Sequence, residues 1–171
     1  MIAPAKQHTE ESDLVISRTF SSPRDLVFAA WTEREHLQHW FGPMGIEIVY
    51  CTNDLRPGGV MHYGMRTPDG NIMWGKWIYR EIVAPESLVF VVSFSDENGG
   101  VTRHPMSAGW PLETLSTVTF DDADGATSVT VRWAAHNATD LERETFNSGH
   151  RSMKEGWTGT FDKLIEYLSH R

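Results

Sequence analysis

Short turn segments separate the β-rich runs between Ile46 and Trp133, and their brevity constrains the fold more than any other feature of the chain. The turns are built from Pro-Gly-Gly, Pro-Asp-Gly, Ala-Pro-Glu and Asp-Asp-Ala-Asp-Gly, residue types that reverse the chain direction. A parallel neighbour needs a crossover of about a dozen residues, so these connections require neighbouring strands to run antiparallel. The pattern predicts strands over residues 46–54, 60–66, 72–83, 87–95, 114–120 and 127–136.

The alternation of side chains within these runs predicts which face of the sheet is buried. Met61, Tyr63 and Met65 share one face of their strand, whereas His62 and Arg66 share the other. Successive residues of a strand point to opposite faces. An antiparallel sheet with this pattern has one face packed on a core and one face toward water.

The first forty residues add one strand and two short helices. Residues 13–20 alternate apolar side chains and predict a seventh strand. Ser22-Pro23 predicts the start of a first helix, and Thr32 with Glu35 fits the capping box of a second. Both helices are rich in aromatic residues at helical spacing. We expect these side chains to close one end of the structure and to carry no chemistry.

The C-terminal segment predicts one long helix that begins after Thr139 as N-cap. An apolar stripe recurs every three or four residues along it, and consists of Phe146, His150, Met153, Trp157, Phe161, Leu164 and Leu168. Gly149 and Gly156 flank the stripe, although a glycine inside a helix costs about 1 kcal/mol relative to alanine. Two explanations are open: tight packing against neighbouring elements, or space for a ligand.

Together these elements predict an α+β fold in which a curved, seven-stranded antiparallel sheet wraps around the long helix. A chain of 171 residues fits one domain, which we place at residues 13–169 after a disordered polar tail at residues 1–12. The net charge of −8 argues against nucleic acid as a partner. No run approaches the roughly 18 apolar residues of a membrane span. A single cysteine and the lack of an apolar leader predict a reducing, cytoplasmic location.

Several separate blocks of the sequence resemble one known family. They read LVISRTFSSPRDLVFAAWTEREHLQHWFGP, LRPGGVMHYGMRTPDG, GKWIYREIVAPESLVF, HPMSAGWPLETLSTVTF and GHRSMKEGWTGTFDKLIEYL. In this order they closely resemble the activator-of-heat-shock-ATPase-like (AHSA-type) members of the START-related SRPBCC superfamily, over about residues 13–168. The resemblance implies a helix-grip fold, like that of START domains and birch-pollen allergens. It also implies a deep cavity between sheet and helix, which in related families takes up lipids, polyketides, plant hormones or other apolar molecules.

Motifs for catalysis and metal binding give weak signals. His36 and His39 form an HxxH pair on a predicted helix, but a metal site needs at least one more ligand. Cys51 lies in a strand pattern and no GxSxG elbow is present in the sequence. We therefore predict no metal, no cofactor and no catalytic residue.

Arg18 has the same strand parity as the core residues of its strand, so its side chain is expected to point inward. A buried guanidinium predicts an ion pair with Glu33 or Glu81, or contact with an anionic ligand. Glu81 would be a general base only if it were buried.

The residues expected to line a ligand cavity are apolar or aromatic, and come from the inward faces of the strands, the long loop and the last helix. They are Met61, Tyr63, Met65, Trp77, Tyr79, Phe90, Val92, Phe94, Trp110, Trp133, Met153, Trp157 and Phe161. For each of them, simple filling of the core is the competing explanation. The loop over residues 95–112 is either a lid, with His104 and Trp110 over the cavity mouth, or a plain connector.

The leading functional hypothesis is a binding protein for a hydrophobic small molecule, aromatic or lipid-like, held between sheet and helix. One alternative is a co-chaperone-like module that docks on a heat-shock ATPase, because the resemblance includes eukaryotic activators in which a domain like this is the C-terminal part. Another is a cyclase- or hydrolase-like enzyme acting on a hydrophobic substrate. A homodimer is also left open.

Overall fold

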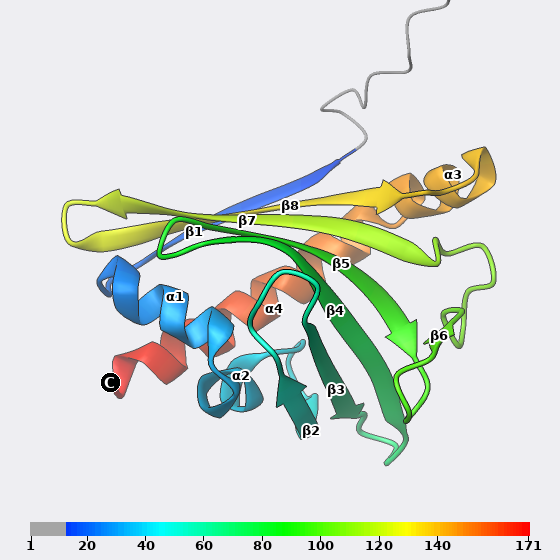
Figure 1. Ribbon diagram of the computed structural model, residues 1–171, viewed down its shortest axis with the longest axis horizontal. Helices are drawn as coiled ribbons and strands as arrows, with labels where there is room; N and C mark the ends of the chain where they lie inside the picture. The colour runs from blue at the N-terminus through cyan, green and yellow to red at the C-terminus, as the bar shows by residue number, and fades with distance from the viewer. Residues whose placement is uncertain (1–12) are drawn as a thin grey trace, which may run out of the picture.

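The computed structural model describes residues 13–171 as one antiparallel sheet with helices against its concave face (Figure 1). The strands are β1 (Leu14–Phe20), β2 (Glu47–Asn53), β3 (Val60–Arg66), β4 (Ile72–Val83), β5 (Ser87–Ser95), β6 (Val101–Thr102), β7 (Glu113–Ala123) and β8 (Ala126–His136). Their order is β1-β8-β7-β5-β4-β3-β2, and the two-residue β6 pairs only with β5. The predicted seven-stranded path is confirmed, with β6 as an addition within the long loop. The predicted tail at residues 1–12 lies outside the described residues.

The helices are α1 (Arg24–Thr32), α2 (Arg34–Trp40), α3 (Asp140–Ser148) and α4 (His150–Ser169). The sequence predicted a single helix after Thr139, and this was wrong. Gly149 has φ −90° and ψ 0°, which departs from regular helical values and separates α3 from α4. The predicted N-terminus is confirmed, because Thr139 and Glu142 form a capping box at the start of α3.

The sheet curves over α4, and the two short helices lie together at one end (Figure 1). α1 packs against β7 and β8, and α2 packs against both α1 and α4. The other end of the sheet carries α3 and the segment around β6 (Figure 1). This is the helix-grip arrangement that the sequence predicted. It leaves the middle of α4 facing the concave side of the sheet.

The short helices begin differently from the prediction. Pro23 is the N-cap of α1, and Glu33 is the N-cap of α2. The Thr32 hydroxyl donates to the Phe28 carbonyl oxygen (2.9 Å), so it does not form the predicted capping box with Glu35. The predicted wall is nevertheless present, because several aromatic side chains of α1 and α2 are buried, among them Trp31 and Trp40 at 0% exposure.

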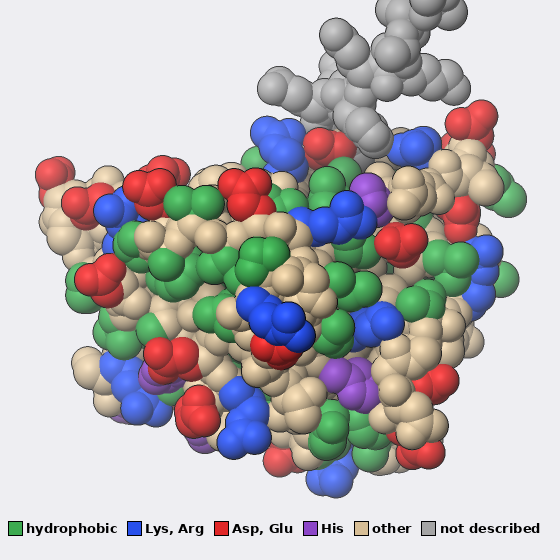
Figure 2. All heavy atoms as spheres, viewed as in Figure 1, with side chains coloured by type: hydrophobic (Ala, Val, Ile, Leu, Met, Phe, Trp, Pro, Cys, Tyr) green, Lys and Arg blue, Asp and Glu red, His purple; other side chains and the backbone are tan. Residues whose placement is uncertain are grey.

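Charged side chains of both signs are interspersed on the surface. On the face shown in Figure 2, Lys and Arg alternate with Asp and Glu, and among the residues that are described there no continuous basic region forms. Such a region is the usual electrostatic footprint of a nucleic-acid binder. Among residues 13–171, no helix combines the length and the apolar composition needed to cross a bilayer.

Candidate ligand cavity

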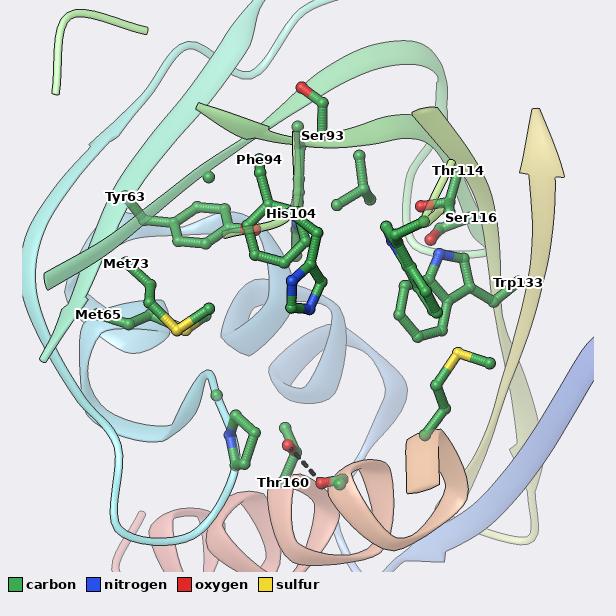
Figure 3. Close-up of a pocket in the computed structure, with 18 of the residues that line it drawn as sticks. Tyr63, Met65, Met73, Ser93, Phe94, His104, Thr114, Ser116, Trp133 and Thr160 are labelled. Atoms are coloured by element: carbon green, nitrogen blue, oxygen red, sulfur yellow. Dashed lines mark hydrogen bonds between the residues drawn. The ribbon is translucent and has the colours of Figure 1, made fainter. Parts of the chain in front are cut away.

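A cavity of about 460 Å³ lies between the concave face of the sheet and α4. Its walls come from β3, β4, β5, β7 and β8, from α4, and from two loops, residues 42–46 and residues 96–112. The side chains that point into it are mostly aromatic rings and methionines (Figure 3). Its volume is within the range typical of small-molecule sites, which is roughly 300–1,000 Å³.

Most of the residues predicted from the sequence lie at this cavity. From the sheet they are Tyr63, Met65, Trp77, Phe90, Val92, Phe94 and Trp133, and from the long loop and α4 they are Trp110, Met153 and Trp157. Their inward direction follows from strand parity and from the apolar stripe of α4. The structure therefore brings together side chains from six separate segments around one space.

Three predicted residues do not reach the cavity. Met61, Tyr79 and Phe161 have exposures of 1%, 1% and 0% and fill the core at the end covered by the short helices. The physical reason is Trp31 of α1, whose ring lies 6.4 Å from that of Trp77 and 5.9 Å from that of Trp157. Its indole occupies the space between sheet and α4, so side chains beyond it have no open volume to face.

The two glycines of the C-terminal segment have different roles. At Gly149, an added Cβ would lie 3.4 Å from the Trp110 ring and 3.6 Å from the Met153 methyl, which is ordinary van der Waals contact. At Gly156, an added Cβ would meet no atom within 4 Å, although the residue is part of the cavity wall. Packing tight enough to exclude a Cβ is therefore absent at both positions, and open space is present at Gly156.

The loop of residues 96–112 is held against α3 and covers part of the cavity. The Trp110 ring lies 5.5 Å from that of Phe146 and 6.1 Å from that of Trp133. Arg103 donates to Glu142 of α3 (2.6 Å) and to the Trp110 carbonyl oxygen (3.3 Å). The loop is thus an anchored part of the wall.

His104 and Tyr63 are the titratable side chains of the cavity wall, which contains no Lys, Arg, Asp or Glu among the described residues. Burial raises the pKa of Tyr63 and so keeps its hydroxyl protonated. Burial lowers the pKa of His104, and the Met106 backbone N–H donates to its Nδ1 (3.0 Å), which requires that nitrogen to be unprotonated. At neutral pH the wall therefore carries no net charge.

Several wall residues were not predicted. Gly42, Pro43 and Ile46 line the cavity, and Lys163 of α4 fixes their loop by donating to the carbonyl oxygens of all three, at 3.1, 3.4 and 3.0 Å. Nothing in the sequence distinguishes this lysine from solvent-exposed ones. Its contacts join segments about 120 positions apart.

Thr114 and Ser116 of β7 also line the cavity and were missed. The sequence did contain evidence for their position. Thr114 and Ser116 lie on the same face of β7 as Val118 and Phe120, which are buried in the core, whereas Thr117 lies on the other face. Small polar residues on an otherwise apolar inward face indicate that this part of the face is not filled by large side chains. Ser93, by contrast, points its side chain away from the cavity (Figure 3).

The HxxH pair has a structural role in the packing of α2 against α4. His36 Nδ1 lies 2.5 Å from the Tyr167 hydroxyl oxygen, and the His39 ring stacks on the Tyr167 ring at 5.5 Å. Within residues 13–171 no group of three or more His, Cys, Asp or Glu side chains is arranged to hold a metal ion. Cys51 is half-buried on β2, and burial raises the pKa of its thiol to about 11, so the reactive thiolate is disfavoured.

Arg18 and Glu81 also differ from their sequence-based interpretations. Arg18 forms an ion pair, but its partner is Asp162 of α4 (2.9 Å) and not Glu33 or Glu81. The parity of Arg18 places it on the inward face of β1, which packs against α4, but its partner on that helix depends on packing that the sequence does not show. Glu81 is exposed, so the burial on which a general-base role depended is absent.

A bent antiparallel sheet that grips a long helix, with an apolar cavity between them, defines a helix-grip protein. Residues 21–169 match the family described as "Activator of Hsp90 ATPase homolog 1-like protein", and the chain belongs to this family. No curated protein matches the sequence.

Solved structures share the fold. A protein from Arthrobacter aurescens has 25% sequence identity and a TM-score of 0.78, with 96% of this chain and 91% of that chain covered. Protein NE0264 from Nitrosomonas europaea has 24% identity and a TM-score of 0.75, with 96% and 99% covered. The AHSA1 protein from Silicibacter pomeroyi has 18% identity and a TM-score of 0.69, with 92% and 97% covered. At such identities the similarity is evidence of the shared fold.

Proposed function

We propose that this protein binds a hydrophobic small molecule, aromatic or lipid-like, in the cavity between the sheet and α4. The observation that carries the proposal is the unfilled space at Gly156. A glycine within a helix is costly, and here no neighbouring atom requires it. Space for a guest molecule accounts for that glycine.

The composition of the wall supports the same function. Apolar and aromatic side chains make up most of the cavity wall, and Met65, Met73 and Met153 add flexible thioethers that adapt to varied shapes. A pocket with this lining gains affinity from burying the apolar surface of its ligand.

A second candidate is the co-chaperone function, which the description of the matched family favours. A docking module of this kind acts through its surface, so ATPase stimulation by the isolated chain would be insensitive to changes inside the cavity. Stimulation of a heat-shock ATPase that persists after the cavity is filled would favour this candidate.

The direct test is native mass spectrometry of the purified protein, followed by extraction and identification of any bound compound. We expect an apolar molecule in wild type and its loss in Gly156→Leu, which places a side chain in the cavity. Thr158→Leu is the matched control, since Thr158 is exposed on the same helix. Wild-type protein that is empty after purification, and that binds no aromatic or lipid-like compound when these are added, would overturn the proposal.

A further inference from the structure

One wall of the cavity carries hydrogen-bonding groups without partners. Thr114 and Ser116 are 2% and 3% exposed, and neither hydroxyl has a hydrogen-bond partner among residues 13–171. The Trp133 indole Nε1 is buried and also unpaired. Trp133 lies directly opposite Ser116 in the β7–β8 register. Three polar groups on two adjacent strands are therefore left unsatisfied in the same place.

The opposite side of the cavity has a different character. Met65 and Met73 lie across the space from Thr114, Ser116 and Trp133 (Figure 3). The wall there continues through the loop of residues 42–46, with Pro43 and Ile46. The cavity thus has one side formed by β3, β4 and this loop, which is apolar apart from the Tyr63 hydroxyl, and a second side formed by β7 and β8, which carries the unpaired polar groups.

Buried polar groups in folded proteins are nearly always hydrogen-bonded, and a site that leaves them unpaired favours a guest that pairs them. An indole N–H can only donate, whereas Ser and Thr hydroxyls donate or accept. The complementary group therefore contains an oxygen acceptor, such as a hydroxyl or a carbonyl. A carboxylate or an ammonium group would be buried without a counter-charge, since the described wall contains no Lys, Arg, Asp or Glu, and that is strongly unfavourable.

From this arrangement we infer that the ligand is an uncharged molecule with an apolar ring body and a hydroxyl or carbonyl oxygen, and that this oxygen contacts Thr114 and Ser116. The ring body lies toward Met65 and Met73. This inference rests on the proposed function and specifies the chemical class and the orientation of the ligand.

Three probes with one bicyclic skeleton test it: naphthalene, 2-naphthol and 2-naphthoate, measured by equilibrium dialysis at pH 7. We expect 2-naphthol to bind about three- to tenfold more tightly than naphthalene, the gain typical of a net hydrogen bond, and 2-naphthoate to bind more weakly than both. In the double variant Thr114→Val with Ser116→Ala, the preference for 2-naphthol over naphthalene should fall, because both hydroxyl groups are removed and only the Trp133 N–H remains on that side. Thermal unfolding checks that the variant folds.

Thr117→Val is the matched control, because it makes the same substitution on the opposite face of β7 and should keep the preference. If naphthalene and 2-naphthol bind equally to wild type, or if 2-naphthoate binds best, the inference is overturned while ligand binding stands. A preference for 2-naphthol that is undiminished in the folded double variant also overturns it. If none of the probes binds, the inference is overturned, and native mass spectrometry of the purified protein decides the proposed function separately.

Discussion

The phenol ring of Tyr63 occupies the space in front of Gly75, its direct partner on the neighbouring strand. A Cβ at position 75 would lie 2.6 Å from the Tyr63 hydroxyl oxygen and 2.7 Å from Cζ. Real Cβ atoms do not approach other atoms this closely, so the glycine is required by the position of the ring. The pair thereby sets how far the Tyr63 hydroxyl reaches into the cavity.

Gly75→Ala is expected to lower the free energy of unfolding by about 1–3 kcal/mol, because the ring must move and its neighbours Phe41 and Trp77 are already in contact with it. Urea unfolding measures this change. In a Tyr63→Ala background the same substitution should cost much less, since the clashing atoms are gone. An equal cost in both backgrounds would contradict the explanation.

Gly156→Ala should do the opposite and raise the free energy of unfolding by about 0.5–1 kcal/mol. An added Cβ there meets no atom within 4 Å, so no steric clash offsets the stabilisation that comes from the higher helix propensity of alanine. Gly159→Ala on the same helix is the control, because its Cβ would lie 3.2 Å from Met44 Cγ and part of the gain should be lost. Thermal or urea unfolding measures the free energy of unfolding of both variants. A larger increase for Gly159→Ala than for Gly156→Ala would contradict this explanation.

The course of the strands and the direction of their side chains could be predicted from the sequence, because short turns and two-residue alternation are local properties. The sequence could not predict which inward-facing residues line the cavity and which are buried in the core. Met61 and Tyr79 have the same parity as Tyr63 and Trp77, yet only the latter two reach the cavity. The difference is caused by Trp31, which arrives from α1 and fills one end of the space, and such packing is a long-range property.

The polar side of the cavity illustrates the same limit. Alternation along β7 places Thr114 and Ser116 inward, and that much was visible in the sequence. That they meet an unpaired Trp133 N–H depends on the register between β7 and β8. Likewise, the helix pattern predicted the C-terminal segment but not its interruption at Gly149, where Trp110 packs closely from a distant loop.

His104 should make the stability of the protein depend on pH. Its pKa is lowered from 6.5 by burial, so below about pH 6.5 the unfolded chain binds a proton that the folded protein resists. The free energy of unfolding should therefore fall as the pH drops from about 6.5, and His104→Gln should lack this part of the decrease. Urea unfolding of wild type and variant at several pH values between 7 and 5 measures the difference. A difference that stays constant over this range would contradict the assignment.

Lys163 should control the order of the loop at residues 42–46. Its Nζ donates to three backbone carbonyl oxygens of that loop, and burial lowers its pKa. Lys163→Met leaves these acceptors without their donor, so we expect a loss of about 1–3 kcal/mol in the free energy of unfolding. Amide hydrogen exchange should also become faster within the loop, because the loop loses its main attachment to α4.

The matched control is Lys154→Met, which removes an exposed lysine from the same helix and should leave exchange in the loop unchanged. The loop also contributes Pro43 and Ile46 to the apolar side of the cavity. Lys163→Met should therefore weaken naphthalene binding as well, even though the lysine itself is not part of the wall. Unchanged exchange in the loop of Lys163→Met would show that the three contacts do not hold it, and its effect on binding would then have to arise elsewhere.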